Sequence, residues 1–530
     1  MSIKKFIKHN QKYFKKNYQI KDNNEILVEF NGWQLCHIIN SYLVNVLSFR
    51  FKAKIKSYPG YSFYNLNLFS KITGYLKWKI NNYFKFRNFA IYNSFNVENF
   101  FLPNLNSVQK SKNKNLYNSI ISKINSKSDL LNLKIQNIHI GDLIYNSYLL
   151  NFKEPIHIKN KRFKKYLYKS LGLFIFWKDY LKTHHVKAII LTHSVYLSAI
   201  NLRIALNLGI PVYSANDEIV YKFNKDNLHP WVDFRNFKKI FSTLSQLQKK
   251  NAIQKAIKII NSRVSGSMKY FFDNYKTSSP FQKEKNKYKK RVILKSKRIK
   301  ILIAAHCFFD SPHIYGKMFF SDFYDWMHYL GKLSLETDYD WYIKSHKNYF
   351  PETRNELENL CEKYKKFKFL PPNVSHHQII NEKVDLVLTC YGTIGWEYPF
   401  LGVPVLLSSA NHPYVNYNFN IKPKNFNEYD KILRSLDKEF LKQQSKKINK
   451  QQICEYYFMN YLHGKHSWLM KGLNSKKYLE LLNFMRTRNI AYSNNIYQIW
   501  EKNFTINRHE AIISTLNSYF TSNKISSILI

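Results

Sequence analysis

The stretch CYGTIGWEYPFLGVPVLLSS (390–409) has the residue types and spacing of a site that binds an anion. It begins at the end of an apolar run typical of a buried strand, and Gly392 and Thr393 then open a short helix. Free backbone N–H groups at a helix N-terminus favour a phosphate, which Gly392 lets approach closely and to which the Thr393 hydroxyl adds a donor. Glu397 lies one helical turn later, where its carboxylate could accept hydrogen bonds from ribose or sugar hydroxyls. The structural alternative is a tight strand-to-helix turn with Glu397 paired to a neighbouring lysine.

A second basic segment, WYIKSHKN (341–348), ends another predicted strand. Lys344 and His346 close this strand, so an ammonium and an imidazole could face the same phosphate. A lone histidine can also be purely structural. Its position at a strand end favours the phosphate-binding interpretation.

The loop after the first strand of the C-terminal half carries three further candidates, in ILIAAHCFFDSPHIYG (301–316). His306, Asp310 and His313 follow the apolar run and are expected to face a cleft. Their spacing matches no standard zinc pattern, so we predict no metal site.

Candidate general bases follow two strands of the N-terminal half. LTHSVYLS (191–198) places His193 at a strand end, and SANDE (214–218) does the same for Asp217 and Glu218. A carboxylate or imidazole here could take a proton from an acceptor hydroxyl. The alternative for the two carboxylates is a solvated loop.

These side chains require strands that end at a common edge, and the sequence predicts such strands. The predicted strands are EILVEF (25–30), VKAIILTH (186–193), IPVYSAND (210–217), KILIAAH (300–306), DWYIKSH (340–346), DLVLTCY (385–391) and VPVLLSS (403–409). Helical patterns alternate with them, which indicates parallel sheets covered by helices on both faces. We therefore predict an α/β protein with two Rossmann-like domains that face each other across a cleft, where such folds bind ligands.

The predicted division of the chain has four parts. An N-terminal domain (1–273) contains a helical elaboration at about 60–185. A polar, basic linker (274–299) leads to a C-terminal domain (300–475). The helical tail (476–530) is expected to pack back on the first domain.

Composition narrows the class of protein. The net charge of +48 would suit nucleic acid or an anionic membrane. However, the lysines are spread along the whole chain, as in a compositionally biased sequence, which argues against a specific nucleic-acid partner. The five cysteines are far apart and favour a reducing compartment, and no apolar run approaches the roughly 18 residues needed to span a bilayer. We expect a cytoplasmic protein that can contact the inner face of the cell membrane.

The order of these motifs resembles GT-B glycosyltransferases of the bacterial capsule and surface polysaccharide biosynthesis type. The matching pieces are GDLIYNSYL, LTHSVYLSAINLRIALNLGIPVY, HCFFDSPHIYGKMFFSDFYDW, WYIKSHKN and TCYGTIGWEYPFLGVPVL, which together contain 79 of the 530 residues. By this resemblance the C-terminal domain binds a nucleotide-sugar donor and the N-terminal domain binds the acceptor.

The resemblance also implies roles for particular residues. Thr393 would contact the donor phosphate and Glu397 the sugar or ribose. Lys344 and His346 match a Lys-Pro-His-Pro segment that contacts the nucleotide phosphate, although both prolines are replaced here. That departure weakens the inference of a CMP-sugar donor more than it weakens phosphate binding.

The catalytic base and the cofactor requirement are also implied by the resemblance. Asp217 and Glu218 take the place of an acidic pair that acts as base in some of these transferases, with Ile219 where a glycine follows the pair there. Such enzymes generally need no metal ion, and the nucleotide-sugar is a substrate rather than a cofactor.

The expected activity is transfer of a sugar from a nucleotide-sugar to a glycan or lipid-linked acceptor during cell-surface polysaccharide assembly. Two alternatives of the same fold remain open, a CDP-polyol phosphotransferase and a nucleotide-sugar epimerase. A third is a non-enzymatic basic protein that binds RNA or a membrane.

Overall fold

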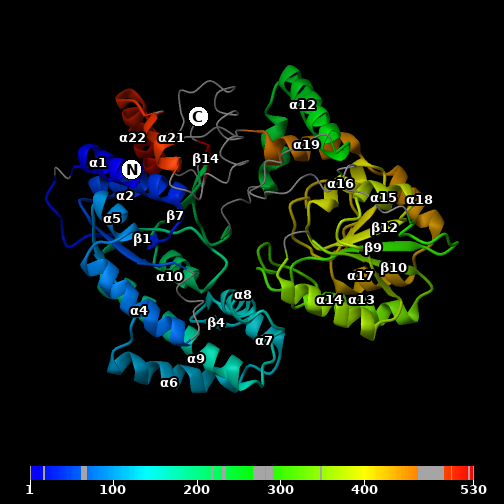
Figure 1. The fold of residues 1–530 in the computed structure, drawn as a ribbon, viewed down its shortest axis with the longest axis horizontal. Helices are drawn as coiled ribbons and strands as arrows, with labels where there is room; N and C mark the ends of the chain where they lie inside the picture. Colours follow the sequence, from blue (N-terminus) through cyan, green and yellow to red (C-terminus); the bar gives the residue numbers. More distant parts are fainter. Residues whose placement is uncertain are drawn as a thin grey trace. The chain divides into compact units, whose positions relative to one another are not determined.

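The protein forms two compact α/β units. The computed structural model describes residues 2–15, 18–60, 68–216, 219–228, 234–266, 281, 290–346, 349–463, 495–502, 504–522 and 526–528. Contacts divide the chain into unit 1 (Met1–Asn151, Ile156–Trp231 and Gly464–Ile530) and unit 2 (Phe152–Pro155 and Val232–His463). Each unit is built around its own sheet, as the prediction of two Rossmann-like domains requires (Figure 1).

Unit 2 contains a five-stranded sheet in which every neighbouring pair is parallel. In spatial order the strands are β11 (Phe367–Phe369), β10 (Asp340–Lys344), β9 (Lys300–Ala304), β12 (Leu386–Thr389) and β13 (Val405–Leu407). The chain builds outward from β9 to β11, returns to the other side of β9, and continues outward to β13. This 3-2-1-4-5 order is that of a Rossmann-like, doubly wound sheet without its sixth strand.

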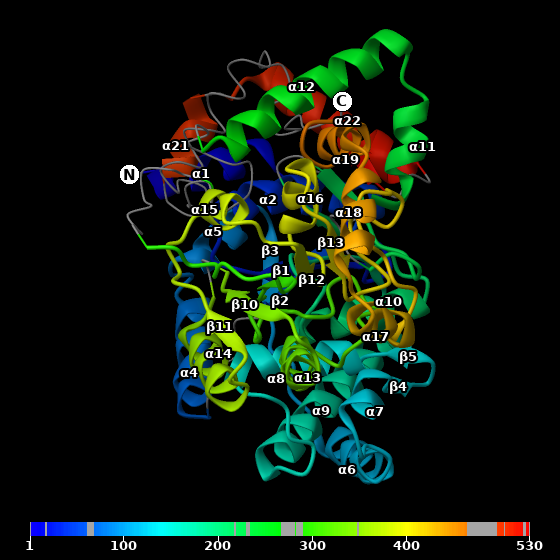
Figure 2. The ribbon, with the colours of Figure 1, turned by 90° about the vertical axis from the view of Figure 1, so that its right-hand side faces the viewer.

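Helices cover both faces of the unit 2 sheet, as the alternating sequence pattern predicts (Figures 1 and 2). On one face lie α13 (Phe323–Glu336), α14 (Pro351–Lys363) and α17 (Phe426–Arg434). On the other lie α15 (His376–Asn381), α16 (Ile394–Phe400) and α19 (Lys450–Tyr461), with α18 (Lys438–Lys446) preceding α19. Several helices begin where the sequence places a capping side chain. For example, Ser375 accepts a hydrogen bond from the backbone N–H of Gln378.

Unit 1 repeats the same strand order and extends it. In spatial order its strands are β3 (Val97–Phe100), β2 (Lys54–Pro59), β1 (Glu25–Phe30), β6 (Val186–Ile190), β7 (Val212–Ala215), β8 (Ile219–Lys222) and β14 (Ser526–Ile528). The five strands β3, β2, β1, β6 and β7 pair in parallel with their neighbours. Strands β8 and β14 are antiparallel additions at one edge. The predicted first strand of this domain matches β1 residue for residue.

The range 60–185, expected to be a helical elaboration of the first domain, is mainly helical but also contains β3, which belongs to the main sheet. Its other described elements are α4 (Leu68–Tyr83), α5 (Asn88–Ser94), α6 (Ser107–Ile121), α7 (Lys127–Leu131), a short hairpin of β4 (Lys134–Ile135) and β5 (Ile138–His139), α8 (Gly141–Phe152) and α9 (Lys161–Thr183). The short helix η1 (Leu197–Ala199) and α10 (Ile200–Asn207) then connect β6 to β7. In the part of the chain that the structure describes, no helix is both long and apolar enough to cross a membrane.

The described part of the C-terminal tail packs on the first domain, as predicted. Helices α21 (Asn495–Lys502) and α22 (Ile506–Thr521) lie beside α1 (Ser2–Tyr13) and α2 (Gln34–Phe51) (Figure 1). Their apolar side chains are part of the same buried cluster as those of β1 and α2. The Tyr497 hydroxyl also lies 2.6 Å from Nδ1 of the buried His37.

The boundary between the units differs from the predicted linker at 274–299. Helices α11 (Phe237–Ser242) and α12 (Gln246–Val264) belong to unit 2, because Ala256 and Ile260 of α12 are fully buried in its core. Within the predicted linker, Ile293 is also buried there and its N–H donates to Glu382. The boundary between the units therefore falls between residues 231 and 232. The sequence prediction missed it because the polar composition of 274–299 gave no sign of these buried contacts.

Candidate functional site

Each sheet has one position where ligands of this fold class usually bind. The strand order reverses between β9 and β12 in unit 2 and between β1 and β6 in unit 1. In open α/β sheets the crevice outside the carboxyl ends of the strands at this reversal is the usual ligand site. The predicted residues can therefore be compared with these two positions.

In unit 2, His306 and the end of β12 meet at the reversal. The Nε2 atom of His306 lies 3.1 Å from the Thr389 hydroxyl and 3.3 Å from the backbone nitrogen of Cys390. Because the Cys390 N–H can only donate, Nε2 is an acceptor and the imidazole proton belongs on Nδ1. Burial and the neighbouring charge of His346 lower the pKa of His306 to about 3. His306 is therefore a neutral side chain that fixes the start of the 390–393 turn.

The 390–393 turn is compact, as in the structural alternative of a tight strand-to-helix turn. The Gly392 N–H donates to the Thr389 hydroxyl (3.3 Å), and a Cβ at Gly392 would lie 3.1 Å from that oxygen and 3.6 Å from Cε1 of His306. On the other side, the Tyr414 hydroxyl donates to the Gly392 carbonyl (2.6 Å). Thr393 is exposed and makes no capping hydrogen bond to α16. Hydrogen bonds within unit 2 thus hold the turn, while Thr393 is exposed.

The structure separates the two candidates at the end of β10. His346 is exposed and lies close enough to His306 to influence its pKa. Lys344 is buried, and its ammonium donates to the carbonyl oxygens of Pro371 (3.3 Å) and Pro372 (2.6 Å). The Lys344 charge therefore fastens β10 to the segment after β11, and the predicted phosphate contact would require it to leave these carbonyls.

Glu397 has a buried partner that the sequence did not reveal. Its side chain is 3% exposed, and its Oε1 accepts hydrogen bonds from Nε (2.8 Å) and a terminal nitrogen (2.5 Å) of Arg263 at the end of α12. The Arg263 guanidinium also lies over the Trp396 ring, 5.7 Å from its centroid. Glu397 is therefore part of an ion pair, as in the structural alternative, but its partner is an arginine rather than the expected lysine. The predicted contact with ribose or sugar would require Glu397 to share or exchange this partner.

The remaining candidates after β9 do not form one cluster with His306. Asp310 is exposed and accepts a hydrogen bond from the Ser311 hydroxyl (3.0 Å). Nε2 of the buried His313 lies 2.7 Å from the Ser321 carbonyl, to which it donates. Among the described residues, no group of three or more His, Cys, Asp or Glu side chains could hold a metal ion.

In unit 1, His193 lies at the corresponding reversal between β1 and β6. Its ring is 5.2 Å from that of Trp33, in an edge-to-face arrangement. Beside it, the carboxylate of Glu29 at the end of β1 accepts a hydrogen bond from the Thr192 N–H (2.6 Å). Sequence reasoning missed Glu29. The available signal was a second acidic residue within the otherwise apolar EILVEF strand.

The predicted acidic pair in unit 1 cannot be placed. Asp217 and Glu218 lie outside the described residues. The flanking strands β7 and β8 pair antiparallel, and the Asn216 side chain accepts a hydrogen bond from the Ile219 N–H (2.8 Å). Their role as base stays a prediction.

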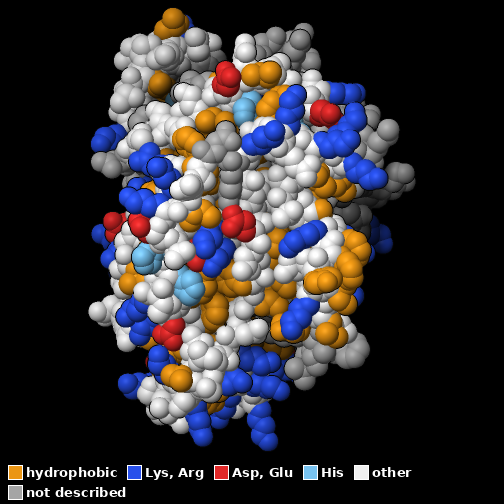
Figure 3. All heavy atoms as spheres, turned by 90° about the vertical axis from the view of Figure 1, so that its left-hand side faces the viewer, with side chains coloured by type: hydrophobic (Ala, Val, Ile, Leu, Met, Phe, Trp, Pro, Cys, Tyr) orange, Lys and Arg blue, Asp and Glu red, His pale blue; other side chains and the backbone are white. Residues whose placement is uncertain are grey.

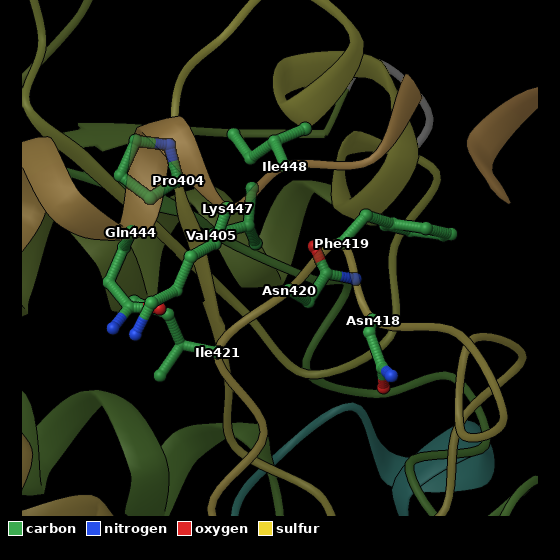
Figure 4. Close-up of a pocket in the computed structure, with 9 residues that line it drawn as sticks. All are labelled: Pro404, Val405, Asn418, Phe419, Asn420, Ile421, Gln444, Lys447 and Ile448. Atoms are coloured by element: carbon green, nitrogen blue, oxygen red, sulfur yellow. The ribbon is translucent and has the colours of Figure 1, made fainter. Parts of the chain in front are cut away.

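A small pocket in unit 2 is lined by none of the predicted site residues; Figure 4 shows its lining. It has a volume of about 30 Å³, enough for roughly one water molecule. Its lining includes Pro404 and Val405, at the amino end of β13, and Asn420. The pocket lies at the amino ends of the strands, whereas the 390–393 turn follows the carboxyl end of β12. It is also too small for a nucleotide.

Buried neutral histidines predict acid sensitivity. Burial lowers the pKa of His37 to about 4 and those of His306 and His412 to about 3. Below about pH 6.5 the unfolded chain binds protons that the folded chain does not, so stability is lost as pH falls, by about 1.4 kcal/mol per pH unit for each such histidine. We expect the urea midpoint to drop between pH 7 and pH 4.5, and to drop less in His306→Gln. The exposed His157→Gln variant should behave like the wild type, and a flat wild-type profile would contradict the assignment.

Among known proteins, only solved structures of low similarity align with this chain. No protein-family model and no curated protein matches the chain. Solved structures that align with it include UDP-GlcNAc 2-epimerase from Neisseria meningitidis bound to UDP-GlcNAc (12% identity, TM-score 0.27, 82% of this chain and 97% of that chain), S. aureus MnaA with UDP (13%, 0.24, 82% and 94%) and MurG from Acinetobacter baumannii (10%, 0.21, 87% and 99%). TM-scores this low support no inference about activity. The assignment of two Rossmann-like units therefore rests on the strand order of the two sheets.

Proposed function

We propose that the protein is a glycosyltransferase of the GT-B type that transfers a sugar from a nucleotide-sugar to a glycan or lipid-linked acceptor in cell-surface polysaccharide biosynthesis. The observation that carries this proposal is the turn at the reversal of the unit 2 sheet. There, His306 and Thr389 hold Gly392 while Thr393 remains exposed. A compact, solvent-facing turn at this position suits the diphosphate of an activated sugar.

The proposed roles follow from charge and exposure. In unit 2, Thr393 and the exposed His346 contact the nucleotide phosphates and stabilise the leaving group. In unit 1, His193, Asp217 or Glu218 takes the proton of the acceptor hydroxyl. Lys344 and Glu397 position the surrounding segments through their buried contacts.

A nucleotide-sugar 2-epimerase or a CDP-polyol phosphotransferase would fit the same two Rossmann-like units, so the test must separate them. The purified protein would be incubated with UDP-, GDP- and CMP-sugars and with a CDP-polyol, each with and without a candidate acceptor. Nucleotide release from a sugar donor only when acceptor is present supports the proposal. Conversion of a nucleotide-sugar without acceptor would establish an epimerase, and consumption of the CDP-polyol alone a phosphotransferase.

A further inference from the structure

Unit 1 exposes an apolar stripe on helix α4 and the segment after it. Leu76, Ile80 and Tyr83 follow the spacing i, i+4, i+7, which places them on one face of the helix. They are 53%, 53% and 81% exposed, and Phe84 and Phe86 continue the stripe at 58% and 53%. We call these five residues the α4 surface. Figure 3 shows hydrophobic side chains gathered on a face of this unit with lysine and arginine side chains among them.

The opposite side of α4 is firmly attached to the core, so the α4 surface faces outward as part of the folded unit. Trp78 is 9% exposed, and its ring packs against those of Phe30 (5.0 Å) and Phe89 (4.9 Å). The large side chains of one helix therefore point in two directions. The outward set contributes nothing to this anchor, and its five large side chains form a patch of the kind that marks an interaction site.

The surroundings of the α4 surface are basic. Lys77, Lys79 and Arg87 are exposed beside it. Helix α4 and the segment that follows it to residue 97 contain five Lys or Arg residues and no Asp or Glu. The occupant of this surface must therefore offer apolar contact together with negative charge.

We propose that the α4 surface docks the protein on an anionic lipid bilayer. Aliphatic and aromatic side chains flanked by lysines are the composition of helices that lie in a membrane interface, where the apolar side enters the acyl boundary and the cations meet anionic headgroups. A second copy of the chain would bring the same positive charges together, and RNA would leave the aliphatic side chains without a partner. This proposal does not depend on which nucleotide-sugar the protein uses.

Vesicle co-sedimentation tests the proposal with the full-length protein. We expect binding to phosphatidylcholine vesicles that contain phosphatidylglycerol, weaker binding to pure phosphatidylcholine, and further weakening at high salt. The Leu76→Ser/Ile80→Ser variant should bind the anionic vesicles at least about tenfold more weakly, because two large apolar side chains no longer enter the bilayer. The Lys77→Gln/Lys79→Gln variant should lose mainly the preference for anionic lipid.

Matched control variants test whether vesicle binding depends on the α4 surface or on exposed apolar and basic side chains in general. Val108→Ser/Leu247→Ser removes two equally exposed apolar side chains elsewhere, and Lys164→Gln/Lys165→Gln removes two exposed charges; neither should change binding. Circular dichroism should show the same thermal midpoint for all variants. Equal vesicle binding by Leu76→Ser/Ile80→Ser and the wild type would overturn the proposal. So would a wild-type dimer that this variant converts to a monomer, or RNA binding that competes with the vesicles and is unaffected by the apolar substitutions.

Discussion

Replacing Arg263 with alanine is expected to destabilise unit 2 by roughly 3–5 kcal/mol, measured as the free energy of unfolding in urea. The substitution leaves the Glu397 carboxylate, which is almost fully buried, without its two hydrogen bonds from the guanidinium. An uncompensated buried charge is among the most costly single changes a protein can undergo. It also removes the guanidinium from the Trp396 ring.

A double-mutant cycle provides the control for this prediction. Glu397→Met alone should also be strongly destabilising, whereas Arg263→Met/Glu397→Met should cost much less than the sum of the two single changes, because neither charge is left buried alone. If Arg263→Ala changed stability by less than about 1 kcal/mol, the pair would not hold this part of unit 2.

Removing residues 495–530 is expected to prevent stable folding of unit 1. Ile496, Tyr497, Trp500, Ile512 and Leu516 are at most 1% exposed and are part of the main core of this unit. Burial of each such side chain is worth about 1.5–3 kcal/mol, so their joint loss approaches the whole stability of a typical domain, about 5–15 kcal/mol. Near-UV circular dichroism and limited proteolysis of the truncated chain would measure the loss.

Point substitutions in the same helices give a graded control for the truncation. Trp500→Ala should cost about 3–5 kcal/mol and Leu516→Ala about 2–5 kcal/mol. Ile506→Ala, at a position that is 57% exposed, should change stability by less than about 0.5 kcal/mol. A truncated protein that unfolds at the wild-type temperature would show that the tail is not part of the core.

Seven of the twelve described strands in the two large sheets could be predicted, because their apolar runs are short and bounded by turn residues. EILVEF matches β1, and KILIAAH, DWYIKSH, DLVLTCY and VPVLLSS each contain the strand that the structure assigns. Strand ends also place His193, His306 and the 390–393 turn at the reversal points, since parallel strands finish at one edge. Strands β2, β3, β8, β11 and β14 were missed; of these, β8 and β14 are antiparallel additions at one edge of the unit 1 sheet.

Long-range partners could not be predicted, because one sequence carries no record of which side chains meet. Arg263 lies 134 positions before Glu397, and nothing local marks it as the partner of a buried carboxylate. Lys344 has the strand-end position of a phosphate ligand, yet its partners are the carbonyl oxygens of Pro371 and Pro372. The same limit explains why 274–299 was taken for a linker, since this polar stretch contains Ile293, which is buried in the core of unit 2.

Nucleotide binding at the 390–393 turn is the central claim, and thermal unfolding with nucleotides tests it most directly. The melting temperatures of the wild type, Thr393→Ser and Thr393→Asp would be measured with UDP, GDP and CMP. Thr393 is exposed and makes no capping hydrogen bond, so Thr393→Asp should fold normally while its carboxylate repels a phosphate. We predict that one nucleotide raises the melting temperature of the wild type and of Thr393→Ser, and that Thr393→Asp shows no rise. An equal rise in Thr393→Asp, or no rise in the wild type with any of the three nucleotides, would contradict the account.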